Sequence, residues 1–149
     1  MLEFRESLKK LENSEEYKFY KKKNTESYLI NVIFLEFPEL NYFSPKTKII
    51  TVFRIKDKII AQELDKEERE FPKLEIDKIK VDFNEAIKIF EKEKSYSQDS
   101  KIITILQQNS EPTWNLSQLT PEIKILHVLI SAVSGELLES TYKQIIEKA

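Results

Sequence analysis

Residues 114–140 read W-N-L-S-Q-L-T-P-E-I-K-I-L-H-V-L-I-S-A-V-S-G-E-L-L-E-S, and the predicted fold is built outward from them. Their apolar, β-branched runs predict two β-strands, a tight turn at Ser134 and Gly135, and a short closing strand. Gly135 is the only glycine in the chain, and a tight turn is where a residue must tolerate a positive φ angle. The stretch therefore predicts antiparallel strands in this part of the chain.

The composition suits one compact domain or two small fused units. The 149 residues are 40% hydrophobic and 11% aromatic, which is enough for a core, and 34% are charged, which indicates a well-solvated surface. A net charge of −2 argues against nucleic-acid binding, because phosphate recognition needs a basic face. Arginine, which binds phosphate and carboxylate groups in a bidentate manner, occurs only at Arg5, Arg54 and Arg69.

The absence of cysteine excludes disulfides, thiolate metal sites and a cysteine nucleophile, and it fits a reducing compartment. The N-terminal M-L-E-F-R-E-S lacks the apolar core of a signal peptide, and no apolar run approaches the roughly 18 residues of a membrane span. We expect a soluble, cytoplasmic protein with no membrane partner. If this sequence is what remains after a signal peptide was removed, the alternative is an extracellular protein.

The first half of the chain reads as two short helices followed by strands. Apolar residues at helical spacing predict a helix at residues 2–12, and Ser14 is placed to cap a second helix at residues 15–23. The predicted strands are residues 28–37, 48–55 and 58–64. We expect residues 41–45 to form a loop with exposed aromatic side chains and residues 65–70 to form a solvated linker.

The second half opens with a helix and continues with strands. Asp82 and Glu85 have the spacing of a capping box, which predicts a helix from there to about residue 94. Residues 74–81 are expected to lead into it as an extended strand. The predicted strands are residues 101–108, 122–132 and 136–139, with a shorter one at 113–117. We expect residues 141–148 to form a terminal helix.

Two pairs of segments repeat between the halves. They are F-R-E-S-L-K-K-L (residues 4–11) with F-N-E-A-I-K-I-F (83–90), and P-K-T-K-I-I-T-V-F (45–53) with P-E-I-K-I-L-H-V-L (121–129). Each half then has a helix that must bury one face of an antiparallel sheet. We predict an α+β fold made of a tandem repeat, with residues 1–70 as a divergent first copy and residues 71–149 as the second. One fused compact domain is the alternative.

The second half also resembles a PepSY domain, over about residues 76–140. The resemblance rests on the strand–turn–strand run I-S-A-V-S-G-E-L-L at residues 130–138 and on I-K-V-D-F-N-E-A-I-K-I-F at residues 79–90, which is similar to the opening helix of that module. Trp114 lies where a tryptophan usually begins the preceding strand, whereas Ser131 replaces the usual aspartate of the turn. The resemblance implies a cystatin-like α+β fold and a binding or inhibitory role without catalysis, often beside extracellular proteases.

The sequence contains no catalytic or metal-binding constellation. His127 is the only histidine, and its predicted strand offers no nucleophile or second base beside it. A single glycine excludes a glycine-rich phosphate loop, and the acids at residues 65–70 lack the spacing of a hard-cation site. We therefore predict no enzyme activity, no cofactor and no bound metal.

Three aromatic residues are the candidate binding residues. Tyr42 and Trp114 precede the proline-led strand in each half, and Phe43 follows Tyr42. Aromatic side chains anchor many protein partners, which suggests a binding role, and packing between sheet and helix is the alternative. Both faces of the strands at 48–55 and 122–130 are apolar, so we expect the helix-free faces of the two sheets to pack together with these aromatics at the rim.

Two classes of function remain. The first is a non-catalytic binding or inhibitory module that engages a protein or peptide, including an extended peptide at an exposed sheet edge. The second is a self-associating protein that dimerises through a sheet edge or face. A small-ligand carrier is a third class, and we disfavour it because each half is too small to enclose a cavity.

Overall fold

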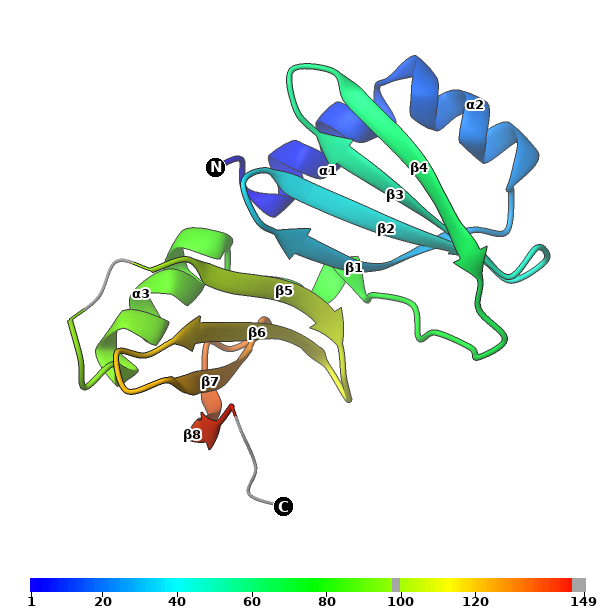
Figure 1. Cartoon of the computed structure of the whole chain (residues 1–149). Coiled ribbons are helices and arrows are strands. Elements are labelled where there is room, and N and C mark those ends of the chain that lie inside the picture. Colours follow the sequence, from blue (N-terminus) through cyan, green and yellow to red (C-terminus); the bar gives the residue numbers. More distant parts are fainter. Residues whose placement is uncertain (98–99, 146–149) are drawn as a thin grey trace.

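The computed structural model describes residues 1–97 and 100–145 and shows an α+β fold (Figure 1). The helices are α1 (Phe4–Glu12), α2 (Glu15–Lys23), the short 3-10 helix η1 (Ile76–Lys78) and α3 (Phe83–Glu93). The strands are β1 (Tyr28–Phe34), β2 (Pro38–Ser44), β3 (Ile49–Ile55), β4 (Ile59–Lys66), β5 (Ile102–Gln108), β6 (Pro112–Leu119), β7 (Lys124–Ser131) and β8 (Leu137–Gln144). None of the helices described is long and apolar enough to cross a membrane.

The eight strands form one antiparallel sheet with the order β4-β3-β2-β1-β5-β6-β7-β8. Strands β1 to β4 form one four-stranded meander and β5 to β8 form another, and each meander follows a helix in the chain (Figure 1). β1 and β5 pair at the centre, with Val32 opposite Leu106. The two meanders therefore share one continuous sheet, and β4 and β8 are its outer strands.

The main hydrophobic core lies between the helices and one face of this sheet. Its largest fully buried side chains include Trp114 of β6, Phe34 of β1 and Phe90 of α3. Because both meanders contribute to the same buried cluster, the helices of the two halves pack on one shared core. Covering one sheet face in this way removes it from water and leaves the other face free of helices.

The helix caps agree with the sequence prediction. The Ser14 hydroxyl accepts a hydrogen bond from the Tyr17 amide at 3.2 Å, and an Asp82 carboxylate oxygen accepts one from the Glu85 amide at 2.8 Å. Each cap satisfies an N–H group that the first helical turn leaves unpaired. The three α-helices accordingly begin within two residues of the positions expected from the sequence.

Three of the described residues have positive φ angles, and all three lie in turns. Gly135, at 81°, closes the predicted turn between β7 and β8, and its amide donates to the Ser131 carbonyl at 2.9 Å. Lys48, at 63°, and Ile123, at 58°, occupy equivalent places, because each directly precedes the third strand of its meander. A left-handed conformation strains isoleucine, whose branched β-carbon crowds the backbone.

Hydrogen bonds join the N-terminus of α1 to the start of α3. The Glu3 carboxylate accepts from the Phe83 amide at 2.9 Å and from the Asn84 amide at 3.2 Å, so it caps α3 from the other half of the chain. The Arg5 guanidinium donates to the Ile79 carbonyl at 2.7 Å. Polar contacts therefore tie the halves together in addition to the shared sheet.

Residues 38–44 form β2, so the predicted loop at residues 41–45 is wrong. Pro38 stands at the first position of this strand, where a missing N–H group is tolerated. The prediction took the proline as the end of the strand structure. In the fold it begins the return strand of a hairpin in which Phe34 lies opposite Pro38.

The predicted entry strand at residues 74–81 and the predicted terminal helix are also wrong. Residues 74–81 contain η1 within irregular backbone, and Leu74 among them is fully buried. Thr141 and Tyr142 belong to β8, whose pairing with β7 continues as far as Gln144. β-Branched and aromatic residues favour this strand conformation. Residues 146–148 of the predicted helix lie outside the described residues.

The two sheets do not pack face to face as predicted. β1 and β5 join them edge to edge, so the helix-free faces of both meanders lie on the same side of one sheet. Pairing of these strands satisfies backbone N–H and C=O groups that packing of the two faces would have left at open edges.

Candidate functional site

Tyr42, Phe43 and Trp114, which were predicted to lie at an exposed rim, are buried, with exposed fractions of 4%, 0% and 0%. The Trp114 indole Nε1–H donates to the Val81 carbonyl at 2.9 Å, and the ring centroid lies 5.5 Å from that of Phe34. The predicted rim position is therefore wrong. Trp114 and Tyr42 both belong to the main hydrophobic core, which was the alternative interpretation of these aromatic residues.

Tyr42 and Phe43 face opposite sides of β2. Tyr42 joins the main core, where its ring centroid is 5.4 Å from that of Tyr17, and burial, followed by the neighbouring Tyr17, raises the pKa of its hydroxyl far above the usual value. Phe43 lies in a small cluster on the helix-free face, and Phe71 covers it at 5.0 Å between ring centroids. The segment after β4 therefore covers this part of the helix-free face.

His127 cross-links three strands on the helix-free face. Its Nδ1 lies 3.0 Å from Glu139 Oε2 on β8, and its Nε2 lies 2.9 Å from Asn115 Oδ1 on β6. Both ring nitrogens therefore have a hydrogen-bond partner within the chain. Nowhere in residues 1–97 and 100–145 do three His, Asp or Glu side chains converge as a metal site requires.

β8 presents a free strand edge, because it is paired only on its β7 side. The pairing is regular from Glu139 to Gln144, and an irregularity separates this stretch from Leu137. Backbone N–H and C=O groups on the free side have no partner strand in the described part of the chain. Such an edge is a template for pairing with another extended chain.

β4 is the outer strand at the other end of the sheet, and its regular stretch is shorter. Its pairing with β3 is regular from Ile59 to Glu63, and the register then shifts before Lys66. Irregular pairing shortens the stretch of an edge that can pair regularly with another strand. β8 is therefore the longer regular edge of the two.

An open pocket of about 290 Å³ lies beside β8. Its lining residues are Ser95, Tyr96, Thr120, Pro121, Glu122, Lys124 and Tyr142. Tyr142 is the β8 residue of the lining, and it lies opposite the buried Leu126, on the helix-covered face of the sheet. This volume is at the small end of the range for ligand sites, so it suits one side chain better than a cofactor.

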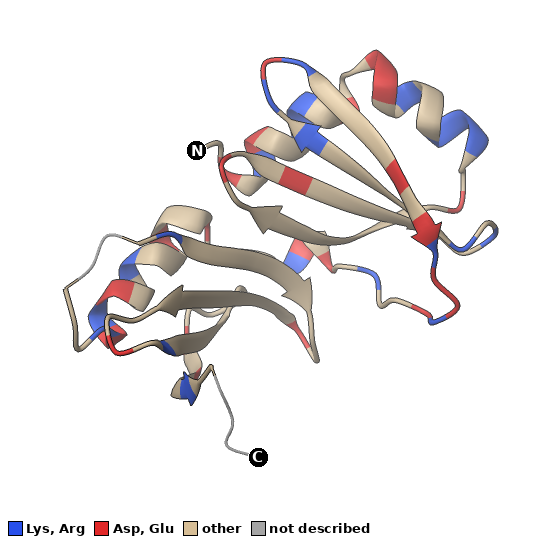
Figure 2. Ribbon diagram, viewed as in Figure 1, with Lys and Arg blue, Asp and Glu red and all other residues tan. Residues whose placement is uncertain are grey.

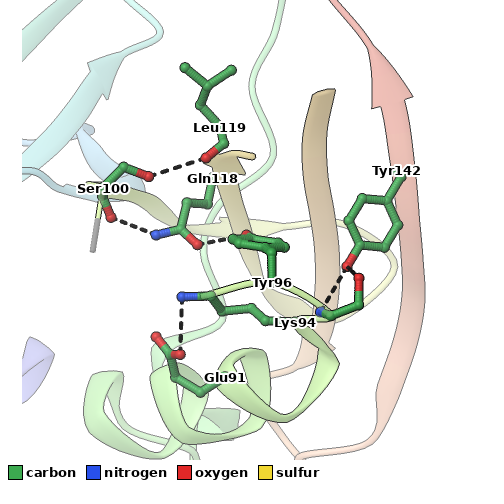
Figure 3. Close-up of polar contacts among 8 residues, drawn as sticks. Glu91, Lys94, Tyr96, Ser100, Gln118, Leu119 and Tyr142 are labelled. Atoms are coloured by element: carbon green, nitrogen blue, oxygen red, sulfur yellow. Dashed lines mark hydrogen bonds and ion pairs between the residues drawn. The ribbon is translucent and has the colours of Figure 1, made fainter. Parts of the chain in front are cut away.

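Hydrogen bonds fix the walls of the pocket (Figure 3). The Tyr142 hydroxyl accepts from the Ser95 amide at 3.1 Å and lies 2.8 Å from the Ser95 hydroxyl. The Tyr96 hydroxyl donates to Gln118 Oε1 at 2.6 Å, and Gln118 Nε2 donates to the Ser100 carbonyl at 2.5 Å. These bonds tie the segment after α3 to β6 and β8, so both tyrosine rings are held in place.

The environment of Tyr96 keeps its hydroxyl protonated. Burial raises the pKa of this hydroxyl above its usual value, and the neighbouring Tyr142 and Glu91 add to the effect. The Lys94 ammonium lies 5.1 Å from the centre of the Tyr96 ring and 3.3 Å from the Glu91 carboxylate (Figure 3). Tyr96 therefore acts as a neutral hydrogen-bond donor near pH 7.

Charged residues are sparse on the strands of the second meander nearest the centre of the sheet and present on its outer strand (Figure 2). β5 and β6 contain no Lys, Arg, Asp or Glu, whereas β8 carries Glu139 and Lys143. Because these two residues are four positions apart in a regular strand, they share the helix-free face. The β8 edge thus presents one charge of each sign.

Sequence reasoning did not find the β8 site. Its signal was the strand-like run L-E-S-T-Y-K within L-L-E-S-T-Y-K-Q, whose second half was assigned to a helix. Comparisons of the chain with known protein families, curated proteins and solved structures gave no match. The assignment of a functional site therefore depends on the geometry of this chain alone.

Proposed function

We propose that the chain is a non-catalytic binding or inhibitory module that pairs an extended segment of a protein or peptide with β8. The observation that carries the proposal is the free β8 edge, regular from Glu139 to Gln144, beside a pocket of about 290 Å³. In this mode of recognition, main-chain hydrogen bonds supply affinity and pockets beside the edge supply specificity for particular side chains.

The pocket accepts one side chain of the bound segment. The rings of Tyr96 and Tyr142, with centroids 6.4 Å apart, give it aromatic walls. Lys124 and Glu122, whose charged atoms are 3.6 Å apart, add an ion pair to the lining. A side chain with an apolar body and a polar tip matches this mixture best.

We further propose that the chain is a tandem of two divergent PepSY-like copies, as the sequence resemblance implies. In support, residues 4–11 and 83–90 align in sequence and fall in α1 and α3, and a four-stranded meander follows in each half. Lys48 and Ile123 are also structurally equivalent, because each has a positive φ angle directly before the third strand of its meander, although the alignment of residues 45–53 with 121–129 pairs Lys48 with Lys124, one residue later.

Selection from a library of random peptides displayed on phage tests the binding function. The bait is the wild-type chain, and Thr141→Pro is the loss variant, because proline in β8 removes an N–H group and disfavours regular pairing. Ala61→Pro in β4 is the matched control on the other edge. We expect selected peptides to bind the wild type and Ala61→Pro but not Thr141→Pro. Peptides that bind Thr141→Pro as well as the wild type would contradict the proposal.

A further inference from the structure

The edge of β8 can pair with a second copy of itself in a limited set of registers. In an antiparallel pair, two residues that lie opposite each other have their side chains on the same face of the sheet. Their backbone N–H and C=O groups either both point toward the partner strand or both point away from it. Odd-numbered residues of one β8 must therefore face odd-numbered residues of the other. Each allowed register is then centred on a single residue of the strand.

One register brings opposite charges together twice. With Thr141 on the twofold axis, Glu139 of each copy faces Lys143 of the other, because both lie two residues from the centre. Centring the pair one residue earlier or later sets Glu139 opposite an uncharged residue. Cross-strand pairs of opposite charge stabilise antiparallel strands, so the register centred on Thr141 is favoured.

Other features of β8 fit the same register. The charged pairs lie within Glu139 to Gln144, where the strand is regular, so the irregularity near Leu137 does not interrupt them. Thr141 faces its own copy across the axis, and its side chain is half-buried in the single chain. Leu137 lies beyond the irregularity, opposite Ile130 of β7, so the regular part of the contact ends at Glu139 of one copy and Lys143 of the other.

β4 has no equivalent self-complementarity. Its regular stretch, Ile59 to Glu63, contains one charged residue, so pairing with itself cannot place an acid opposite a base. Pairing of β4 with β8 of another copy would be head-to-tail and would extend into open-ended filaments. A twofold contact between two β8 strands closes after two copies.

We infer that the partner of β8 is a second copy of this chain, bound about a twofold axis at Thr141 so that two eight-stranded sheets join as one. The inference rests on the proposed function of β8 as a pairing edge, and it names the partner. A single strand-to-strand contact falls in the class of interfaces below roughly 1,200 Å², which is the class of weak and transient contacts.

Complementary charge reversal tests the ion pairs. Sedimentation equilibrium from about 1 to 300 µM measures the Kd of the dimer. Glu139→Lys alone and Lys143→Glu alone each turn two attractive pairs into two repulsive ones, so the Kd should rise about tenfold. An equal mixture of the two variants regains both attractive pairs in a heterodimer, and its Kd should return to the wild-type range. Glu63→Lys, on β4, is the matched control and should leave the Kd unchanged.

Folding of the variants needs its own check, because Glu139 also bonds His127 at 3.0 Å. The fluorescence of the buried Trp114 reports whether Glu139→Lys keeps its core. Lys143→Glu leaves the contact between Glu139 and His127 in place, so it reports on pairing alone.

Cysteine substitution tests the register without changing charge, because the chain has no cysteine. Thr141→Cys places two thiols directly opposite each other, within the Cα separation that a disulfide allows, so mild oxidation should give a covalent dimer. Ser140→Cys is the matched control. In the register centred on Thr141, residue 140 of one copy faces residue 142 of the other, so the two thiols do not lie opposite each other. A covalent dimer with Ser140→Cys and none with Thr141→Cys would overturn the register.

The outcomes separate this inference from the proposed function. A wild-type chain that stays monomeric up to about 300 µM, with no covalent dimer from Thr141→Cys, overturns the inference. If phage-selected peptides still bind β8 in that case, the binding function stands and only the partner is wrong. If neither a copy nor a peptide binds, both fail. Assemblies that grow beyond the dimer would instead indicate pairing of β4 with β8.

Discussion

Replacement of Trp114 tests the core that the two meanders share. The side chain is fully buried, and its Nε1–H donates to the Val81 carbonyl at 2.9 Å. Its ring centroid lies 5.5 Å from that of Phe34, which belongs to β1 in the other meander. A cavity at this position therefore weakens the packing of both halves.

The structure gives an expected magnitude for two substitutions. Trp114→Ala removes a fully buried ring and should lower the free energy of unfolding by about 3–5 kcal/mol. Trp114→Phe keeps a ring but leaves the Val81 carbonyl without its donor, so we expect a loss of about 2 kcal/mol. The difference between the two variants separates loss of packing from loss of the hydrogen bond.

Urea unfolding followed by far-UV circular dichroism measures these losses, because the variants lack the only tryptophan of the chain. Phe19→Ala is the matched aromatic control, since the Phe19 ring on α2 is 63% exposed, and its cost should stay below about 1 kcal/mol. A cost below about 1 kcal/mol for Trp114→Ala would refute the reasoning, because no buried aromatic ring is removed that cheaply.

Three further predictions concern a turn and the contacts between the halves. Ile123→Gly should raise the free energy of unfolding by about 1 kcal/mol in urea titrations, because glycine adopts a φ of 58° without strain, and no gain would mean that the turn is unstrained. Arg5→Ala should lower the free energy of unfolding by about 1–2 kcal/mol, because it loses the hydrogen bonds to the Ile76 and Ile79 carbonyls. Lys9→Ala, on the exposed face of α1, is the control and should leave the free energy of unfolding unchanged. Equal losses for the two variants would contradict the role of Arg5. Burial, followed by the nearby Asp82, raises the pKa of Glu3 above 4.5, so its contribution to stability is present below pH 4.5 and is lost as the pH rises through the raised pKa. Glu3→Gln should remove this part of the pH dependence of the urea midpoint, and an unchanged profile would contradict it.

The sequence was sufficient for features that depend on neighbouring residues. Ser14 and Asp82 cap their helices as predicted, and Gly135 closes the predicted turn. Each of these signals involves residues within three or four positions of one another, so a single sequence contains them. The alternation between helices and antiparallel strands follows from the same local patterns, and the α+β class was therefore predictable.

Pairing between distant strands was not predictable from these patterns. Both faces of β3 looked apolar, and the prediction covered one of them with the other sheet. In the fold, Phe71 covers the small cluster around Phe43, and β1 joins β5 through backbone hydrogen bonds. Backbone pairing uses groups that nearly every residue has, so the choice of partner strand leaves little trace in residue type.

The candidate site was missed for a related reason. Trp114, Tyr42 and Phe43 were expected at the surface because aromatic residues anchor partners, but the same residues dominate cores, and residue type alone does not separate the two roles. The free edge of β8 follows from the order of the strands in the complete sheet. Thr141 and Tyr142 favour a strand by propensity, yet the lysine- and isoleucine-containing residues after them have helical spacing.

Hydrogen exchange of the β8 amides at low and high protein concentration tests most directly the claim that β8 is the pairing edge. A strand that adds to β8 bonds the amides on its free side and slows their exchange. We predict that exchange in residues 137–144 slows as the concentration rises, while exchange in β4, residues 59–66, stays the same. Exchange in β8 that is independent of concentration, or slowing confined to β4, would contradict the claim.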